Sequence, residues 1–319
     1  MLHTIVVPLD RSSFGEQALE PAHRIAHRLR ANLELVHVFD PTLRSIYASG
    51  APRLDPQLDR DLRAEARAYL EMTAERERQG ADVQVTATFL DGPVVKTLAD
   101  YTAKFDGAFV VMTTHGRGGL ARAWLGRVTE GLVRSSLVPV LAIRSGRETP
   151  PAVAMGEFGR VLVPLAEAHF GAEVIELTVE IAGTTGAGYI LLYVLAPPLR
   201  ILPPEPTIVA VPDPDAETAA AHAFLSELAN PLRSRGIPVS IKVVVDSNPA
   251  RAILEFAEDN GIDLVGMATH GFRGAKRLLV GSVADKVLRS APAPVLLVHP
   301  PKESKEKARA AANPATAAR

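Results

Sequence analysis

The sequence contains no cysteine among its 319 residues. This absence excludes disulfide bonds, thiolate nucleophiles and cysteine metal sites, and it fits a reducing compartment. An excess of charge of one sign is also missing, because 35 Lys and Arg residues stand against 36 Asp and Glu residues, for a formal net charge of −1. This balance gives no general attraction to nucleic acid or to a membrane surface, so we expect neither as a partner.

Long hydrophobic runs are absent as well. No apolar run approaches the roughly 20 residues that a membrane-spanning helix needs. The first residues, MLHTIVVPLD, enter a strand-like run at once and lack the basic start, apolar stretch and small-residue cleavage site of a secretory signal. We therefore expect a soluble, cytoplasmic protein. The chain is long enough for two domains of roughly 100–200 residues each.

The most informative feature that is present is an internal repeat. The run IVVPLD, which starts at Ile5, returns as VLVPLA, which starts at Val161, and VVMTTHGRGG at Val110 returns as VGMATHGFRG at Val265. The offset is 156 residues for the first pair (161 − 5) and 155 for the second (265 − 110). A repeat of this length indicates two copies of one domain. We expect domain 1 at residues 1–147, a linker at 148–158, domain 2 at 159–300 and a disordered tail at 301–319.

Each copy alternates short apolar runs with amphipathic stretches, the pattern of βαβ units. Continuous apolar runs such as Ala108–Met112 are typical of strands that helices cover on both faces. The expected fold class is therefore α/β, with two tandem, doubly wound sheets of five parallel strands. In the first copy we expect strands near residues 4–9, 33–39, 83–90, 107–113 and 138–144, and helices near 13–30, 57–79, 93–105 and 127–136. The second copy repeats this order from residue 159 onward.

A glycine-containing turn in each copy follows the fourth strand, at the edge of the sheet where α/β proteins bind ligands. In the second copy the strand ends at Met267 and runs into Ala268–Gly271, and Gly281–Val283 then opens a helix. Glycines allow a close approach of the backbone, and free N–H groups at the start of a helix favour an anion. The alternative is a pair of tight strand-to-helix turns that hold no ligand.

The spacing of these glycines resembles the universal stress protein family, whose pattern is Gly, two residues, Gly, nine residues, then Gly-Ser or Gly-Thr. The second copy has Gly271 and Gly281-Ser282, while Ala268 stands at the position of the first glycine. The resemblance covers residues 2–145 and 159–299. It implies a Rossmann-like fold of the adenine-nucleotide α-hydrolase type.

The first copy departs further from this pattern. Gly116 and Gly126 match, yet Thr113 replaces the first glycine and Arg127 replaces the hydroxyl residue. Arg127 can clamp a phosphate at the start of the helix, or its bulk can fill the place of the phosphate. Because a long side chain stands where a small hydroxyl residue is expected, the second copy is the better candidate for nucleotide binding.

The resemblance also implies which residues meet the nucleoside. The acidic residue that follows the family's first strand falls on Asp10 in the first copy and on Ala166 in the second. Asp10 can accept hydrogen bonds from a ribose, or it can cap the helix that starts near Ser12. The candidate nucleotide-binding residues are Asp10, Val38, Met112, Thr113, Gly116, Gly126, Arg127, Val128, Pro164, Val194, Met267, Ala268, Gly271, Arg273, Gly281, Ser282 and Val283.

The function implied by the resemblance is binding of ATP or AMP in stress adaptation, with Mg²⁺ able to accompany a triphosphate. Hydrolysis is expected to be slow at most. His115 and His270 precede the turn glycines, but no acid–base or metal constellation accompanies them, so a hydrogen bond that holds the turn explains them better than catalysis. The alternative function is a nucleotide-free interaction scaffold in the stress response, because neither copy keeps the full set of residues.

The last strands of the two copies are expected to pair. Family members of single-domain length associate through their last strands, so the resemblance implies that Pro139–Arg144 and Pro294–His299 pair within the chain and form a pseudo-dimer. Each strand would shield the edge of the other. Dimerisation of whole chains is left open by the sequence.

Overall fold

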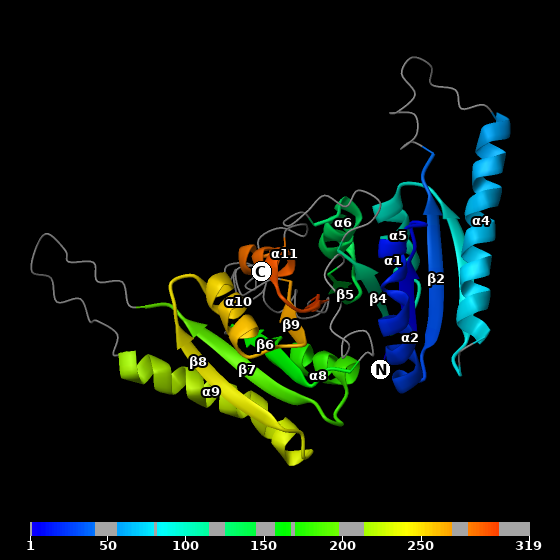
Figure 1. The fold of residues 1–319 in the computed structure, drawn as a ribbon. Coiled ribbons are helices and arrows are strands. Elements are labelled where there is room, and N and C mark those ends of the chain that lie inside the picture. Colours follow the sequence, from blue (N-terminus) through cyan, green and yellow to red (C-terminus); the bar gives the residue numbers. More distant parts are fainter. Residues whose placement is uncertain are drawn as a thin grey trace, which may run out of the picture. The chain divides into compact units, whose positions relative to one another are not determined.

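The computed structural model in Figure 1 describes residues 2–41, 56–79, 82–114, 125–144, 157–166, 170–197, 214–269 and 280–299. The chain divides into two compact units. Unit 1 holds Met1–Glu157 together with Ala275–Val280 and Pro294–His299, and unit 2 holds Phe158–Gly274, Gly281–Ala293 and Pro300–Arg319. The units therefore differ from the two sequence repeats, because Ala275–Val280 and the last strand of the second repeat are grouped with unit 1.

Unit 1 contains a parallel sheet whose strands follow the order β3-β2-β1-β4-β5. Its elements are β1 (Thr4–Pro8), α1 (Ser13–Glu16), α2 (Leu19–Leu29), β2 (Asn32–Phe39), α4 (Pro56–Gln79), β3 (Val85–Asp91), α5 (Val94–Thr102), β4 (Ala108–Thr113), α6 (Arg127–Ser135) and β5 (Val140–Ile143). The five expected strands are confirmed, with ends that differ by one or two residues.

The expected helix at residues 13–30 is wrong in one detail, since it is split into α1 and α2. Pro21 lies in the first turn of α2, where its missing N–H is tolerated, but its ring does not allow the helix to continue back through residue 17. The backbone instead turns at Gln17 and Ala18, whose N–H groups donate to Phe14 and Gly15.

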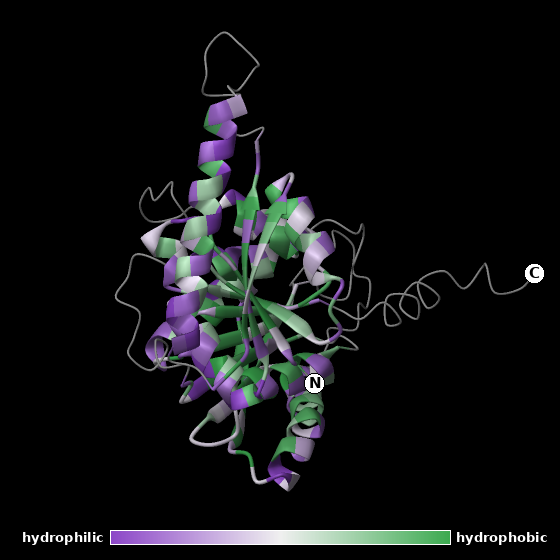
Figure 2. Cartoon of the chain, turned by 90° about the vertical axis from the view of Figure 1, so that its right-hand side faces the viewer, coloured by the Kyte–Doolittle hydropathy of each residue, from purple (hydrophilic) through white to green (hydrophobic). Residues whose placement is uncertain are grey.

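Helices cover both faces of this sheet. Successive residues of a strand point to opposite faces, so Glu34 and Phe39 of β2 face opposite ways. Glu34 accepts a hydrogen bond from Tyr101 of α5, and Phe39 lies under the guanidinium of Arg63 of α4. The sheet is therefore doubly wound, as expected. In Figure 2 most strands are coloured hydrophobic, whereas the helices carry hydrophilic bands.

Unit 1 contains a sixth strand that comes from the end of the sequence. Strand β10 (Val295–Val298) pairs antiparallel with β5, with Val295 opposite Ala142 and Leu297 opposite Val140. His299 follows it, and its Nε2 donates a hydrogen bond of 2.8 Å to the carbonyl of Val133 in α6. The pairing that was expected between these two segments is present, and it covers the edge of β5.

Unit 2 repeats the same arrangement with four strands in the order β9-β6-β7-β8. Its elements are β6 (Arg160–Leu165), α8 (Gly171–Ala182), β7 (Gly188–Leu195), α9 (Pro214–Ser234), β8 (Val239–Val245), α10 (Pro249–Asp259), β9 (Leu264–Ala268) and α11 (Ser282–Ser290). Strand β9 packs closely on α8, because a Cβ atom at Gly266 would lie 2.7 Å from Cγ2 of Thr178.

Within the described residues, no helix combines the length and the hydropathy needed to span a bilayer.

Candidate functional site

The candidate site lies where strands end and helices begin. In unit 1, β4 ends at Thr113 and α6 starts after Gly126; in unit 2, β9 ends at Ala268 and α11 starts after Gly281. Strand β4 is parallel to its neighbours β1 and β5, and β9 is parallel to β6. The ends of β4 and β9 therefore lie at the carboxyl edge of the parallel strands, the usual place for a ligand in this architecture.

The same hydrogen bond joins the two described ends of each turn. The amide of Gly126 donates to the carbonyl of Thr114, and the amide of Gly281 donates to the carbonyl of Thr269, both at 2.7 Å. A Cβ atom at Gly126 would lie 2.9 Å from that carbonyl oxygen, so a side chain there requires the backbone to move. The turn therefore depends on glycine at this position, as a close approach of two backbone segments predicts.

The helix that follows each turn starts without a capping side chain at its N-cap, because Gly126 and Gly281 have none. The first amides of α6 and α11 thus depend on other acceptors, and the helix dipole places positive charge there. Arg127 and Ser282, the first residues of the two helices, are both exposed. Gly116, Gly271 and Arg273, like His115 and His270, lie outside the described residues.

A buried hydroxyl supports the turn in unit 1. Thr129, in the first turn of α6, donates from Oγ1 to the carbonyl of Thr113 at 3.0 Å. Both side chains are buried, Thr129 at 2% exposure and Thr113 at 6%. Ala284 occupies the place of Thr129 in unit 2, at an offset of 155 residues (284 − 129). Sequence reasoning missed Thr129, because an apolar residue does the same packing in the other half.

The strand residues expected at the site divide by burial. Met112 and Met267 are 5% and 6% exposed, so their side chains belong to the core and only their backbone can reach a ligand. The remaining strand and helix residues are half-buried: Val38, Val128, Pro164, Val194, Ala268 and Val283. None of these side chains carries a charge or a hydrogen-bonding group.

Asp10 organises a separate turn after β1, which we call the Asp10 turn (Asp10–Glu16). Its Oδ1 accepts hydrogen bonds from the amide and hydroxyl of Ser12, at 3.1 and 2.5 Å. The Ser12 hydroxyl in turn accepts from the amide of Gly15 at 3.0 Å. The N-cap of α1 is therefore Ser12, and of the two alternatives for Asp10 the direct helix cap is wrong, since Asp10 holds the Ser12 hydroxyl instead. A Cβ atom at Gly15 would lie 2.7 Å from Asp10 Oδ1, so a larger residue there would displace this carboxylate.

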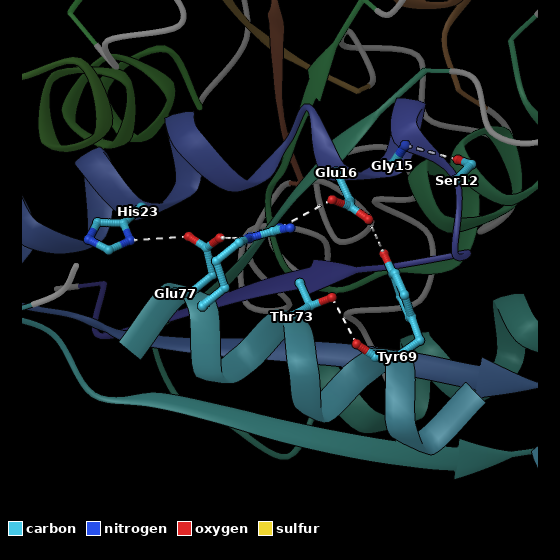
Figure 3. Close-up of polar contacts among 8 residues, drawn as sticks. Ser12, Gly15, Glu16, His23, Tyr69, Thr73 and Glu77 are labelled. Carbon is cyan, nitrogen blue, oxygen red and sulfur yellow. Dashed lines mark hydrogen bonds and ion pairs between the residues drawn. The ribbon is translucent and has the colours of Figure 1, made fainter. Parts of the chain in front are cut away.

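A polar network joins this turn to α4 (Figure 3). Glu16 accepts hydrogen bonds from the hydroxyl of Tyr69 at 2.8 Å and from Nη2 of Arg76 at 3.1 Å. Arg76 also donates to Glu77, whose second oxygen lies 3.5 Å from Nδ1 of His23. Burial raises the pKa of Tyr69, and the neighbouring Glu16 carboxylate raises it further. No pattern in the sequence connects these residues.

His37 is a second residue that sequence reasoning missed. Its ring is buried at the end of β2, and Nδ1 donates a hydrogen bond of 2.7 Å to the carbonyl of Leu9, next to Asp10. The ring therefore fixes the backbone at the end of β1. In the part of the chain that the structure describes, no three His, Asp or Glu side chains are grouped to hold a metal ion.

Comparisons with known proteins agree with this geometry. A family model for the universal stress protein family matches residues 1–144 and 157–299. The universal stress protein Mb2019 of Mycobacterium bovis is 27% identical over 315 residues, which are 94% of this chain and 96% of that protein. A solved universal stress protein from Archaeoglobus fulgidus, at 19% identity, has a TM-score of 0.66 and covers 94% of this chain and 97% of its own.

A further solved structure is a universal stress protein in complex with cAMP, which covers 44% of this chain and 97% of its own at 21% identity, with a TM-score of 0.35. The family model matches both repeats separately and together spans most of the sequence. Because the family model covers both repeats, the chain is a tandem member of the universal stress protein family.

Proposed function

We propose that the chain binds an adenine nucleotide, ATP or AMP, first of all at the β9–α11 turn of unit 2, and that it acts in stress adaptation. The observation that carries the proposal is the start of α11. There the amide of Gly281 donates a hydrogen bond of 2.7 Å to the carbonyl of Thr269. Gly281 is the N-cap and has no side chain to accept from the first amides of the helix, and the next residue, Ser282, is exposed.

The chemistry of this start suits a phosphate. An anion at the N-terminus of a helix is stabilised by about 0.3–1 kcal/mol at exposed positions, and backbone amides add hydrogen bonds to its oxygens. The Ser282 hydroxyl adds a further donor in unit 2, where α6 of unit 1 presents the long Arg127 side chain. The second half is therefore the better site for phosphate groups.

The test is Ser282→Arg, which copies Arg127 into unit 2. We expect this variant to abolish the tight nucleotide binding of unit 2 and to leave only weaker binding in unit 1, measured by calorimetry with ATP, AMP and cAMP as probes, each with and without Mg²⁺. Ser290→Arg is the matched control, because it places the same side chain at the exposed last residue of the same helix. Unchanged affinity in Ser282→Arg would rule out this turn as the phosphate site.

The second candidate function is an interaction scaffold that holds no nucleotide. It is favoured by the incomplete set in each half, since Ala166 replaces Asp10 in the second and Arg127 replaces Ser282 in the first. Native mass spectrometry of gently purified protein separates the two candidates. Copurified ATP or AMP supports the first, and a ligand-free protein that also fails to take up added nucleotide supports the second.

We also propose that the β5–β10 pairing makes the chain a pseudo-dimer of two domains, at residues 1–147 and 159–300, joined by the linker at 148–158. The protein would work in the cytoplasm, with hydrolysis of ATP slow at most. Release of phosphate from ATP, followed over hours, tests the last point.

A further inference from the structure

The Asp10 turn is attached to α4 at both of its ends. Near its start, Nη2 of Arg11 donates to Glu65 at 2.8 Å, and at its end Glu16 accepts from Tyr69 at 2.8 Å. The first contact is a surface ion pair, because the Glu65 side chain is 64% exposed, and such pairs contribute little. The Tyr69–Glu16 contact is different, since it joins a half-buried hydroxyl to a carboxylate.

This attachment continues to the carboxylate of Asp10 without a break. Glu16 is the last residue of α1, Gly15 precedes it in the same helix, and the Gly15 amide donates to Ser12, which donates to Asp10. Asp10 is also close enough to Tyr69 to raise the pKa of its phenol, although it is the smallest of the causes. A shift of Tyr69 is therefore passed to the Asp10 carboxylate through a single short helix.

The first half of the chain has all three residues of this attachment, and the second half has none of them. The sequence Phe14-Gly15 returns as Phe170-Gly171, and Ala68–Leu70 returns as Ala223–Leu225, so the matching positions are defined by the repeat itself. Unit 1 has an acid at the turn, an acceptor two residues after Phe14, and a phenol on α4. Unit 2 replaces all three by side chains without a hydrogen-bonding group: Ala166, Ala172 and Phe224.

We propose that Tyr69 is a positioning residue, which acts through Glu16 to hold the Asp10 carboxylate in the orientation that accepts hydrogen bonds from the hydroxyls of a ribose. The ligand in this statement rests on the proposed nucleotide binding, extended to unit 1. The positioning itself needs no ligand. This role explains why unit 2 lacks the acid, the acceptor and the phenol together: without a carboxylate at Ala166, no residues are needed to position it.

Hydrogen exchange of the full chain without ligand tests the positioning. Tyr69→Phe and Glu16→Ala, which copy unit 2, should each speed exchange of the segment Asp10–Glu16 by about 3–10-fold, the equilibrium equivalent of one lost hydrogen bond. Glu16→Gln keeps an acceptor oxygen and should exchange nearly as slowly as the wild type. Tyr101→Phe is the matched control, because it removes a phenol from α5. Unchanged exchange of the segment in Tyr69→Phe, or equal acceleration throughout unit 1, would overturn the proposal.

A second experiment follows the same segment with AMP and with its 2′,3′-dideoxy analogue. AMP should slow exchange of Asp10–Glu16 in the wild type, the analogue should have little effect, and Tyr69→Phe should weaken the effect of AMP by a similar factor of about 3–10. If AMP leaves the segment unaffected while Tyr69→Phe still speeds its exchange, the ribose assignment in unit 1 is wrong and the positioning stands. An AMP effect that survives Tyr69→Phe at full strength overturns the role of Tyr69.

Discussion

Tyr69 and Tyr101 are half-buried phenols, and each donates a hydrogen bond to a carboxylate of unit 1. Burial raises the pKa of Tyr101 to about 12, and Glu34 adds to the increase, against the lowering effect of a hydrogen bond with Thr88. The pKa of Tyr69 is raised as well, first by burial and then by Glu16. Both groups thus stay protonated in the folded protein at a pH where an exposed tyrosine ionises.

This difference predicts how stability depends on alkaline pH. A tyrosine in the unfolded chain ionises near pH ~10. Because the folded-state pKa lies above that value, the stabilisation is complete below pH ~10 and is lost as the pH rises toward the folded pKa of about 12. The free energy of unfolding from urea titrations should fall over this interval. Tyr101→Phe should make the fall shallower, and an identical pH profile in that variant would contradict the assignment.

Gly266 is the residue whose replacement has the clearest local cost. A Cβ atom there would lie 2.7 Å from Cγ2 of Thr178, a residue with no exposed surface. Gly266→Ala should therefore destabilise the protein by about 1–3 kcal/mol in urea denaturation, as overpacking of a core does.

The partner substitution identifies the cause. Thr178→Ala should recover part of the loss caused by Gly266→Ala, so that the double variant is more stable than the sum of the single effects predicts. Gly186→Ala serves as the control, because Gly186 has a φ of +78° and nothing within 4 Å of an added Cβ. Its cost is backbone strain, and Thr178→Ala should not relieve it.

At the scale of elements, β10 protects the edge of a strand in unit 1, as the expected pairing of the two last strands implied. It covers the edge of β5, whose four residues are all buried, and His299 binds a carbonyl in the last turn of α6. An uncovered hydrophobic edge strand is a template for pairing with another chain. Removing β10 therefore leaves both an open edge and an unpaired helix carbonyl.

A chain that ends at Ala293 should be less stable than the full chain and should associate through β5, which sedimentation velocity would detect as dimers or larger species. The matched control is a chain that ends at Pro300 and so keeps β10 and His299. A monomeric, fully stable protein ending at Ala293 would show that β10 does not protect β5.

The elements themselves were largely predictable from the sequence. Strands such as β4 are buried along their whole length, and their continuous apolar runs identify them without knowledge of the fold. The break between α1 and α2 was not predicted, because the apolar spacing continues through residues 13–30 while Pro21 interrupts the backbone. A local backbone constraint here overrides the periodic pattern.

For the whole molecule, the two halves are unequal at the start of α6 and α11. Calorimetry should give about one tightly bound nucleotide per chain, because only one helix start presents a small hydroxyl residue, and unit 1 should fill only at higher nucleotide concentration. Arg127→Ser should open the matching position in unit 1 and raise the number toward about two.

A matched variant with the opposite sense is Ser282→Arg in the Arg127→Ser background, which should move tight binding from unit 2 to unit 1. An unchanged stoichiometry in Arg127→Ser would mean that Arg127 is not what excludes phosphate there.

The candidate site was predictable from the sequence in part, because the two copies can be compared position by position. Glycines and the residues beside them stand out in a repeat, whereas Thr129 and His37 do not.

The sequence by itself determined the family, the duplication and the order of strands and helices, because a repeat and a hydrophobic period are properties of neighbouring residues. Only the tertiary structure decided which residues surround Asp10 and that His299 reaches a carbonyl of α6. The Tyr69–Glu16 contact spans 53 residues and the His299–Val133 contact spans 166. Contacts over such distances depend on how the strands and helices pack, and no local pattern of side chains records them.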